Sequence, residues 1–230
     1  MKPMTNPDWF VIALSRAPML MAAGLLMFSL LVSAQASASD RPDTAVRAMI
    51  SVALRELKRW LARLRSEGDA VLTRQLIERI TLPHLDLTRM ARYVLGSYWQ
   101  SATPSQCERF RRAFRAHLLQ LCSRAMAKHA TELTQFVHDV RVHYRLARYD
   151  VARRTATVQV IAVTQSLGWV QLELQLHDHD GSWKIYEITS SGINILVGIR
   201  SDLQAQLRCG DLETVIRRLE HRVGLPNHSP

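Results

Sequence analysis

Residues 181–203, GSWKIYEITSSGINILVGIRSDL, decide the fold of this chain. A strand pattern over 183–189 ends just before Gly192 and leads directly into the apolar segment 193–199. Glycine tolerates backbone conformations that other residues avoid, so Gly192 suits a switch from strand to helix. If this strand belongs to a curved sheet, the following apolar residues lie beside its concave face. Those residues are Ile193, Ile195 and Leu196.

The segments before this stretch predict the rest of the sheet. Apolar and polar residues alternate over 140–146, 157–162 and 170–176. A period of two is typical of strands with one buried face. Asp180-Gly181 is a hairpin-turn signal between the last of these segments and strand 183–189. Four strands with short connections predict an antiparallel meander.

Helical patterns flank the predicted sheet on both sides in the sequence. Apolar residues recur at helical spacing over 46–64, 71–80 and 87–95, and again after residue 211, and Asp86 and Asp211 are predicted to start the last two of these helices. Thr103-Pro104-Ser105-Gln106 predicts a helix start with a capping box. On that helix we expect a solvated outer face carrying Arg109, Arg112 and Arg115, with a partner-docking role as the alternative. The order of elements predicts an α+β fold in one domain, residues 37–224, followed by a loose tail, 225–230.

The N-terminus predicts export. Lys2 and Arg16 precede the apolar stretch 19–32, and Ala34-Gln35-Ala36 is a small-x-small cleavage site. This arrangement predicts a signal peptide over residues 1–36. The alternative is an uncleaved anchor, but the apolar stretch is shorter than the ~20 residues that span a bilayer. The net charge of +10 attracts anionic surfaces, and export favours acidic lipid headgroups over nucleic acid as the partner.

Cysteines and histidines give no strong metal or disulfide motif. Cys107 and Cys122 share a predicted helix about 22 Å apart, too far for a disulfide, and a bridge from either to Cys209 stays open. The run 177–180, His-Asp-His-Asp, is a weak metal candidate, because Asp and His are ordinary turn residues. A looser group forms the second weak candidate. It consists of His138, Asp139 and His143.

Two stretches of the chain resemble the MlaC-type family, also called toluene-tolerance auxiliary proteins. The first stretch carries Val94-Leu95-Gly96, Tyr98-Trp99, Ala102-Thr103-Pro104-Ser105-Gln106, Phe110 and Phe114. The second carries residues 180–187, DGSWKIYE, and Gly192-Ile193-Asn194-Ile195. The chain departs from the family where Asn194 replaces the usual serine, at Gly198-Ile199, and in its three cysteines.

The resemblance implies a periplasmic phospholipid carrier and not an enzyme. Such carriers work with an inner-membrane ABC lipid transporter complex and an outer-membrane lipoprotein complex in maintaining lipid asymmetry. The resemblance also implies helices wrapped on a twisted antiparallel sheet around an apolar pocket. Phospholipid is then the bound cargo, and we expect no cofactor. A hopanoid or sterol-like cargo, and a non-catalytic adaptor that bridges membrane complexes, stay open as alternatives.

The candidate lipid-binding residues lie on the strands and at the strand-to-helix junction. Alternating apolar residues on strands usually fill a dry core, and it is the resemblance that favours a lipid wall here. An anionic headgroup would sit at the mouth of the pocket, near surface Arg and Lys. The predicted wall residues are Val142, Tyr144, Leu172, Leu174, Ile188, Ile193, Ile195 and Leu196.

Overall fold

A computed structural model describes residues 41–63, 70–165 and 168–225 of the chain. The predicted signal peptide, residues 1–36, lies outside the described residues, as do residues 226–230 of the predicted tail. Within the described ranges, no helix combines the length and the apolar character that crossing a bilayer requires.

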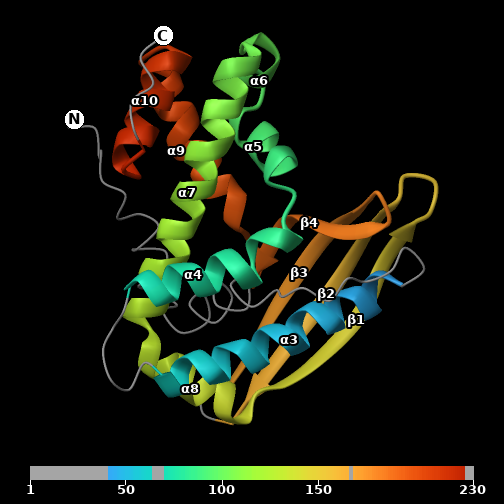
Figure 1. Ribbon diagram of the computed structural model, residues 1–230. Coiled ribbons are helices and arrows are strands. Elements are labelled where there is room, and N and C mark those ends of the chain that lie inside the picture. Colours follow the sequence, from blue (N-terminus) through green and yellow to red (C-terminus); the bar gives the residue numbers. More distant parts are fainter. Residues whose placement is uncertain (1–40, 64–69, 166–167, 226–230) are drawn as a thin grey trace.

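Helices precede and follow a single sheet (Figure 1). The preceding elements are α3 Pro42–Arg63, α4 Ala70–Ile80, the 3-10 helix η1 Leu82–His84, α5 Leu87–Leu95, α6 Tyr98–Ser101, α7 Pro104–Lys128 and α8 Ala130–Asp139. The strands are β1 Arg141–Asp150, β2 Thr155–Thr164, β3 Gly168–His179, β4 Ser182–Ser190 and β5 Ile193–Asn194. The last helices are α9 Ile195–Arg208 and α10 Leu212–Arg222.

The sheet confirms the predicted antiparallel meander and the α+β class. The strand order is β1-β2-β3-β4-β5, and each neighbouring pair is antiparallel. Asp180 and Gly181 form the predicted β3–β4 turn with φ of 50° and 81°. The two-residue β5, which pairs with the end of β4, was not predicted. Gly192 has φ of 83°, in the left-handed region that glycine adopts without a steric penalty, so it permits the turn between β4 and β5.

Side-chain caps start the helices where the sequence predicted them. The Thr103 hydroxyl accepts from the Gln106 N–H, and the Gln106 side chain accepts from the Thr103 N–H, which completes the capping box of α7. Asp86 caps α5 by accepting from the Arg89 N–H at 2.8 Å. Asp211 caps α10 in the same way. These local signals need no tertiary contact, which is why the sequence alone was sufficient to place them.

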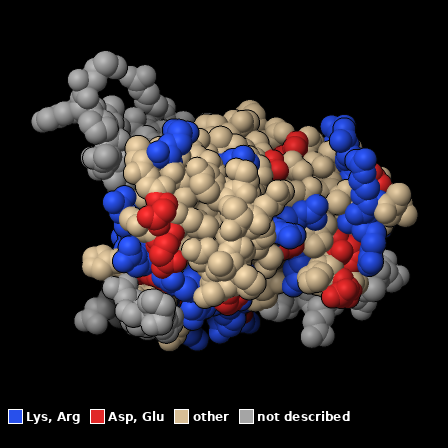
Figure 2. Space-filling model, turned by 90° about the horizontal axis from the view of Figure 1, so that it is seen from above, with Lys and Arg blue, Asp and Glu red and all other residues tan. Residues whose placement is uncertain are grey.

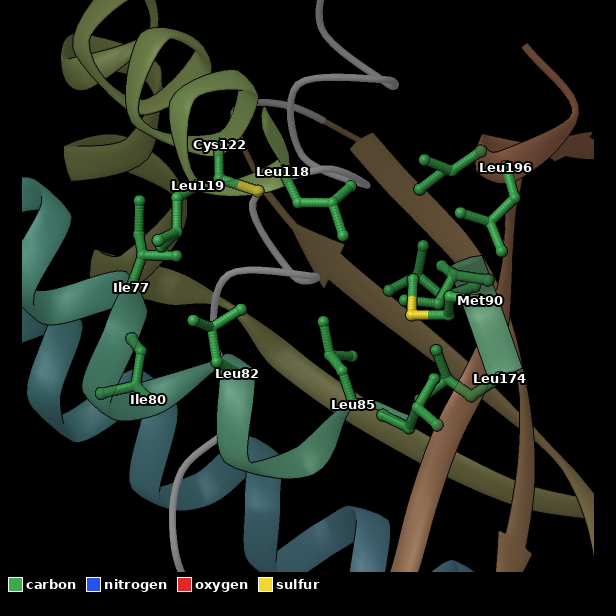
Figure 3. Packing of buried hydrophobic residues seen from close by; sticks show 14 of the residues in the cluster. Ile77, Ile80, Leu82, Leu85, Met90, Leu118, Leu119, Cys122, Leu174 and Leu196 are labelled. Atoms are coloured by element: carbon green, nitrogen blue, oxygen red, sulfur yellow. The ribbon is translucent and has the colours of Figure 1, made fainter. Parts of the chain in front are cut away.

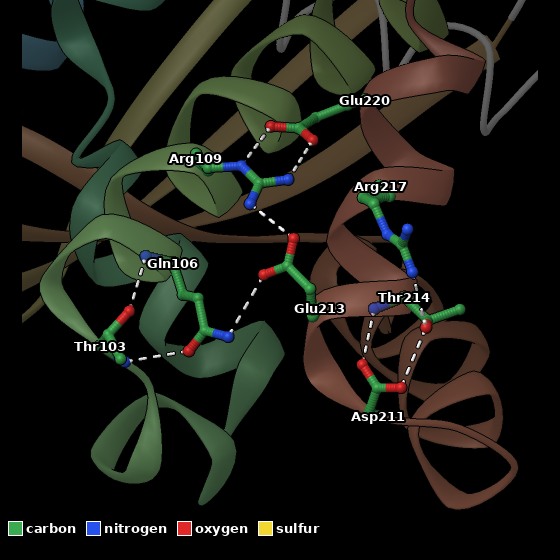
Figure 4. A network of polar contacts seen from close by, with 8 residues as sticks. All are labelled: Thr103, Gln106, Arg109, Asp211, Glu213, Thr214, Arg217 and Glu220. Carbon is green, nitrogen blue, oxygen red and sulfur yellow. Dashed lines mark hydrogen bonds and ion pairs between the residues drawn. The ribbon is translucent and has the colours of Figure 1, made fainter. Parts of the chain in front are cut away.

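The prediction of a solvated arginine face on α7 is wrong for Arg109. Its guanidinium lies between α7 and α10, where it donates to both carboxylate oxygens of Glu220 at 2.9 and 2.6 Å (Figure 4). A third bond, of 2.6 Å, reaches Glu213. The side chain of Arg109 is only 12% exposed and that of Glu220 only 2%. Arg112 is exposed as expected, whereas Arg115 is half-buried and pairs with Glu78.

The helix backbones approach the sheet most closely at its two sides. Among the described residues, α3 approaches β1 and β2, whereas η1, α5 and α9 approach β4 (Figure 1). None of the described helices approaches the central strand β3 to a similar extent. The core cluster therefore joins two groups of helices through the side chains of one sheet face.

Candidate functional site: the inner face of the sheet

One face of the sheet is almost entirely apolar, and we call it the inner face. Cross-strand pairing aligns its side chains in rows that run across β1, β2, β3 and β4. One row contains Leu146, Val158, Leu174 and Ile188. The next row contains Tyr144, Val160, Leu172 and Ser190.

The opposite face carries polar side chains between the two apolar rows, so the sheet has two different faces there. Gln159, Glu173 and Thr189 form a row between the two apolar rows, and all three point to the other side. This alternation produces the burial pattern in β2 and β3, where every second side chain is buried. The two apolar rows therefore lie on the inner face of the sheet.

Ser190 is a buried polar residue on the inner face. Its side chain is 1% exposed, and its hydroxyl has no hydrogen-bond partner within the described ranges. Buried polar groups are nearly always hydrogen-bonded, because an unpaired one costs about 1–3 kcal/mol. The inner face thus offers one unused donor at the β4 end of its surface.

The structure brings most of the predicted wall residues together near β4. Leu174 pairs directly with Ile188 across β3 and β4, and Leu172 lies two residues along the same face. All three are at most 2% exposed. Figure 3 shows Leu196 from α9 and Leu174 from β3 on either side of Met90.

Three predicted wall residues lie elsewhere. Val142 and Tyr144 belong to β1, on the inner face but next to α3, and both are half-buried. The Arg47 guanidinium lies 4.6 Å from the centre of the Tyr144 ring. Burial raises the pKa of Tyr144 to about 12, against the opposing effects of Arg47 and of a hydrogen bond with Ser51. Ile193 lies on the edge strand β5 and is 48% exposed, so it borders the apolar surface rather than forming part of it.

The predicted set missed the middle of the same surface. Val158, Val160 and Ala162 of β2 lie between β1 and β3 on the inner face, and each is at most 2% exposed. Their alternation with polar residues was the available signal. Met90 of α5 was also missed, because its proximity to β3 depends on tertiary packing that a helical pattern does not show.

The β4–α9 junction is held by polar contacts at its outer side. The Asn194 side chain accepts from the N–H groups of Leu196 and Val197 and so caps α9. Its amide also donates to Glu187 at 2.7 Å. This arrangement fixes the direction in which α9 leaves the sheet and places Leu196 on the inner side (Figure 3).

Two histidine–aspartate groups were considered for metal binding. In the first, residues 177–180, the side chains make other contacts; the second, His138, Asp139 and His143, does not form a metal-type cluster in the described part of the chain. His177 Nε2 contacts the Asp86 carboxylate, and Asp178 forms an ion pair with Arg154. Burial raises the pKa of Asp86, but hydrogen bonds from the Arg89 N–H and from His177 outweigh it and hold the pKa below its usual value. No group of three or more His, Cys, Asp or Glu residues suited to a metal occurs in the described ranges.

Charges on the face seen from above in Figure 2 are mixed. Lys and Arg form separate groups around a broad area of uncharged residues, and Asp and Glu lie beside several of them. On this face the net positive charge is therefore not gathered into one continuous basic patch, the usual footprint of nucleic-acid binding.

Two known proteins are similar to this chain over most of its length. The intermembrane phospholipid transport system binding protein MlaC of Haemophilus influenzae is 18% identical over 156 residues, which make up 66% of this chain and 69% of that protein. A solved structure of a phospholipid-binding protein from Ralstonia solanacearum, in complex with a phospholipid, matches with a TM-score of 0.66 and 20% identity. That match covers 80% of this chain and 98% of the other, and at this identity it shows a shared fold.

A family model gives the decisive assignment. The model described as MlaC protein matches residues 55–221, which include the whole sheet and the helices on both sides of it. Because the match extends over more than half of the chain, this protein belongs to the MlaC protein family.

Proposed function

We propose that this protein is a periplasmic phospholipid carrier that shields acyl tails against the inner face of its sheet. The observation that carries the proposal is the pair of apolar rows on that face, which the described helices border at β1–β2 and at β4. Membership of the MlaC family supports this assignment. So does the phospholipid complex of the similarly folded Ralstonia protein.

The energetic need for such a surface follows from the hydrophobic effect. Each methylene exposed to water costs about 0.8 kcal/mol, so two tails with about thirty methylenes would cost on the order of 20 kcal/mol. A carrier offsets this cost by offering apolar contacts in place of those in the bilayer. Leucine, isoleucine and valine side chains at the inner face suit this role, since they leave few buried polar groups to be satisfied.

The proposed carrier exchanges lipid with an inner-membrane ABC transporter complex and an outer-membrane lipoprotein complex. The name of the Haemophilus relative, which refers to an intermembrane phospholipid transport system, supports this part of the proposal. Direction would come from these partners, because the sequence has no P-loop or other nucleotide motif. Binding and transfer require no bond to be made or broken, and we assign no catalytic residue.

Lipid extraction tests the proposal directly. Protein purified from its native periplasm is extracted with organic solvent, and the lipids are identified and counted by mass spectrometry. We expect close to one phospholipid per protein. A folded protein that carries no lipid after native expression would contradict the proposal and favour the adaptor.

A matched pair of variants tests the inner face as the site. Leu174→Glu places a carboxylate among the tails and should abolish loading, because a buried unpaired charge is strongly unfavourable. Gln171→Glu adds the same charge to the opposite face of the same strand and should load normally. If Leu174→Glu does not fold, Val142→Glu, at a half-buried edge position, provides the second test. Normal loading of folded inner-face variants would place the lipid elsewhere.

A further inference from the structure

A second feature lies on the other side of α5 from Met90. A pocket of about 450 Å³ opens between α5, α6 and β4. We call it the arginine–aromatic pocket, and its lining includes Arg89, Arg92, Tyr93, Trp99, Tyr186 and Glu187. Pockets of this size hold small organic ligands.

Two arginine side chains that line this pocket place their guanidinium groups over aromatic rings. The Arg89 guanidinium carbon lies 4.4 Å from the centre of the Tyr186 ring, and that of Arg92 lies 5.6 Å from the Trp99 ring. Stacking uses the face of a guanidinium and leaves its in-plane N–H groups available to an acceptor. The pocket therefore presents guanidinium donors beside its aromatic lining.

A third guanidinium, from α9, lies next to two residues that line the pocket, Tyr93 and Gly96. Arg200 lies 4.8 Å from the centre of the Tyr93 ring. Its Nη2 is 3.2 Å from the position that a Cβ would occupy at Gly96, a residue that also lines the pocket. Gly96 has φ of 61°, a backbone conformation that favours glycine, and a side chain there would also have to displace the end of Arg200 slightly.

The positive charge of these arginines is largely not neutralised by neighbouring acids. Neither Arg92 nor Arg200 forms an ion pair with any residue in the described part of the chain. Asp86, close to Arg89, already accepts from a backbone N–H and contacts His177. Glu187 is held by the Asn194 amide, and burial, together with Glu173, raises the pKa of Glu187.

The pocket adjoins the inner face through α5 and β4. On α5, Met90 points toward Leu174 (Figure 3), while its neighbour Arg89 lines the pocket. On β4, Glu187 lines the pocket and the next residue, Ile188, belongs to the inner face. The helix α5 and the strand β4 thus each carry residues of the inner face on one side and residues of the arginine–aromatic pocket on the other.

We propose that the arginine–aromatic pocket binds a phosphate group, and specifically the headgroup phosphate of a phospholipid whose tails lie on the inner face. Guanidinium groups match phosphate oxygens in geometry as well as in charge. The assignment to a lipid headgroup rests on the proposed carrier function. Free phosphate or a soluble phosphate ester presents the same oxygens, so the test must separate the two sources.

The test compares two lipids with identical tails. Delipidated protein is titrated with a short-chain phosphatidylglycerol and with the diacylglycerol that has the same chains and no phosphate. The Arg89→Gln/Arg92→Gln variant should bind the phosphatidylglycerol about tenfold more weakly or worse, because hydrogen bonds to a charged group are lost. Its affinity for the diacylglycerol should stay within about twofold of wild type. Arg112→Gln, which removes a charge from an exposed site on α7, should change neither affinity.

Each result separates this inference from the proposed function. If wild type binds neither lipid, the carrier function itself is wrong. If wild type binds both lipids and the double variant binds both equally well, the carrier function stands and the pocket assignment is overturned. Phosphorus NMR with glycerol 3-phosphate completes the test. Millimolar or tighter binding of that ester by a wild type that shows no preference for the phosphatidylglycerol would assign the pocket to soluble phosphates and overturn the headgroup assignment. Circular dichroism and thermal unfolding confirm that each variant is folded.

Discussion

Replacing Arg109 by methionine should destabilise the protein severely. This side chain joins α7 to α10 and holds the carboxylate of Glu220, whose side chain is 2% exposed (Figure 4). Methionine preserves much of the aliphatic packing but leaves that carboxylate buried without a partner. Breaking a buried pair by removing one member costs about 3–5 kcal/mol. Glu213 adds little to this loss, because it is 39% exposed and remains solvated.

The assay is urea and thermal unfolding followed by circular dichroism. For a domain of this size each kcal/mol lowers Tm by about 2–4 °C, so Arg109→Met should lower it by roughly 6–20 °C. The matched control is Arg111→Met on the same helix. Arg111 pairs with Glu108 three residues earlier, and the two side chains are 38% and 49% exposed. That control should cost about 0.5 kcal/mol or less, within the range of exposed pairs.

A double variant separates charge from packing. Arg109→Met/Glu220→Leu removes both members of the buried pair, and it should recover most of the lost stability, because no unpaired charge remains in the interface. Exposed substitutions ordinarily differ in unfolding free energy by less than about 1 kcal/mol. If the unfolding free energies of Arg109→Met and Arg111→Met differ by no more than that, the Arg109 cluster is not a buried ion pair in solution and the reasoning fails.

Two further predictions concern acid stability and a backbone constraint. Burial lowers the pKa of His117 to about 4, with added effects from Arg222 and Arg124, whereas an unfolded histidine titrates near 6.5. Because the unfolded state then binds the extra proton, native stability falls as pH decreases through this window, and the unfolding free energy of wild type should fall by about 2 kcal/mol relative to His117→Gln between pH 7 and pH 5. An equal pH dependence in the two proteins would contradict the burial of this imidazole. Gly96→Ala should lower the unfolding free energy by about 1–3 kcal/mol in urea unfolding. The control is Gly210→Ala, where an added Cβ would have its nearest neighbouring atom 3.7 Å away, and it should change the unfolding free energy by about 0.5 kcal/mol or less. Equal effects would show that position 96 tolerates a side chain.

Local patterns in the sequence predicted the secondary structure well, because their causes are local. Alternation of apolar residues located the four main strands, and Thr103, Asp86 and Asp211 marked the starts of three helices. Each of these signals depends on neighbours within a few residues. Strand β5 escaped because two residues carry no period, and its pairing is set by the turn at Gly192.

Contacts between distant elements were beyond the reach of the same reasoning. Arg109 was expected in solvent, and its partners lie more than 100 residues later in the chain. A helical pattern shows which residues share a side of a helix, but not which element packs against that side. For the same reason Leu174 and Ile188 were identified together, as neighbouring strand residues, whereas Met90 was not.

The strand β1 ends the sheet on one side, and this position has a consequence for association between chains. An edge strand exposes unpaired N–H and C=O groups that can accept a strand from another molecule. On β1 the exposed positions include Arg141, Arg145 and Arg148, and the pairing with β2 shifts register between Leu146 and Arg148. Repulsion between like charges and an irregular edge both oppose the addition of a second copy. The sheet edge beside the apolar inner face is in this way protected against edge-to-edge aggregation.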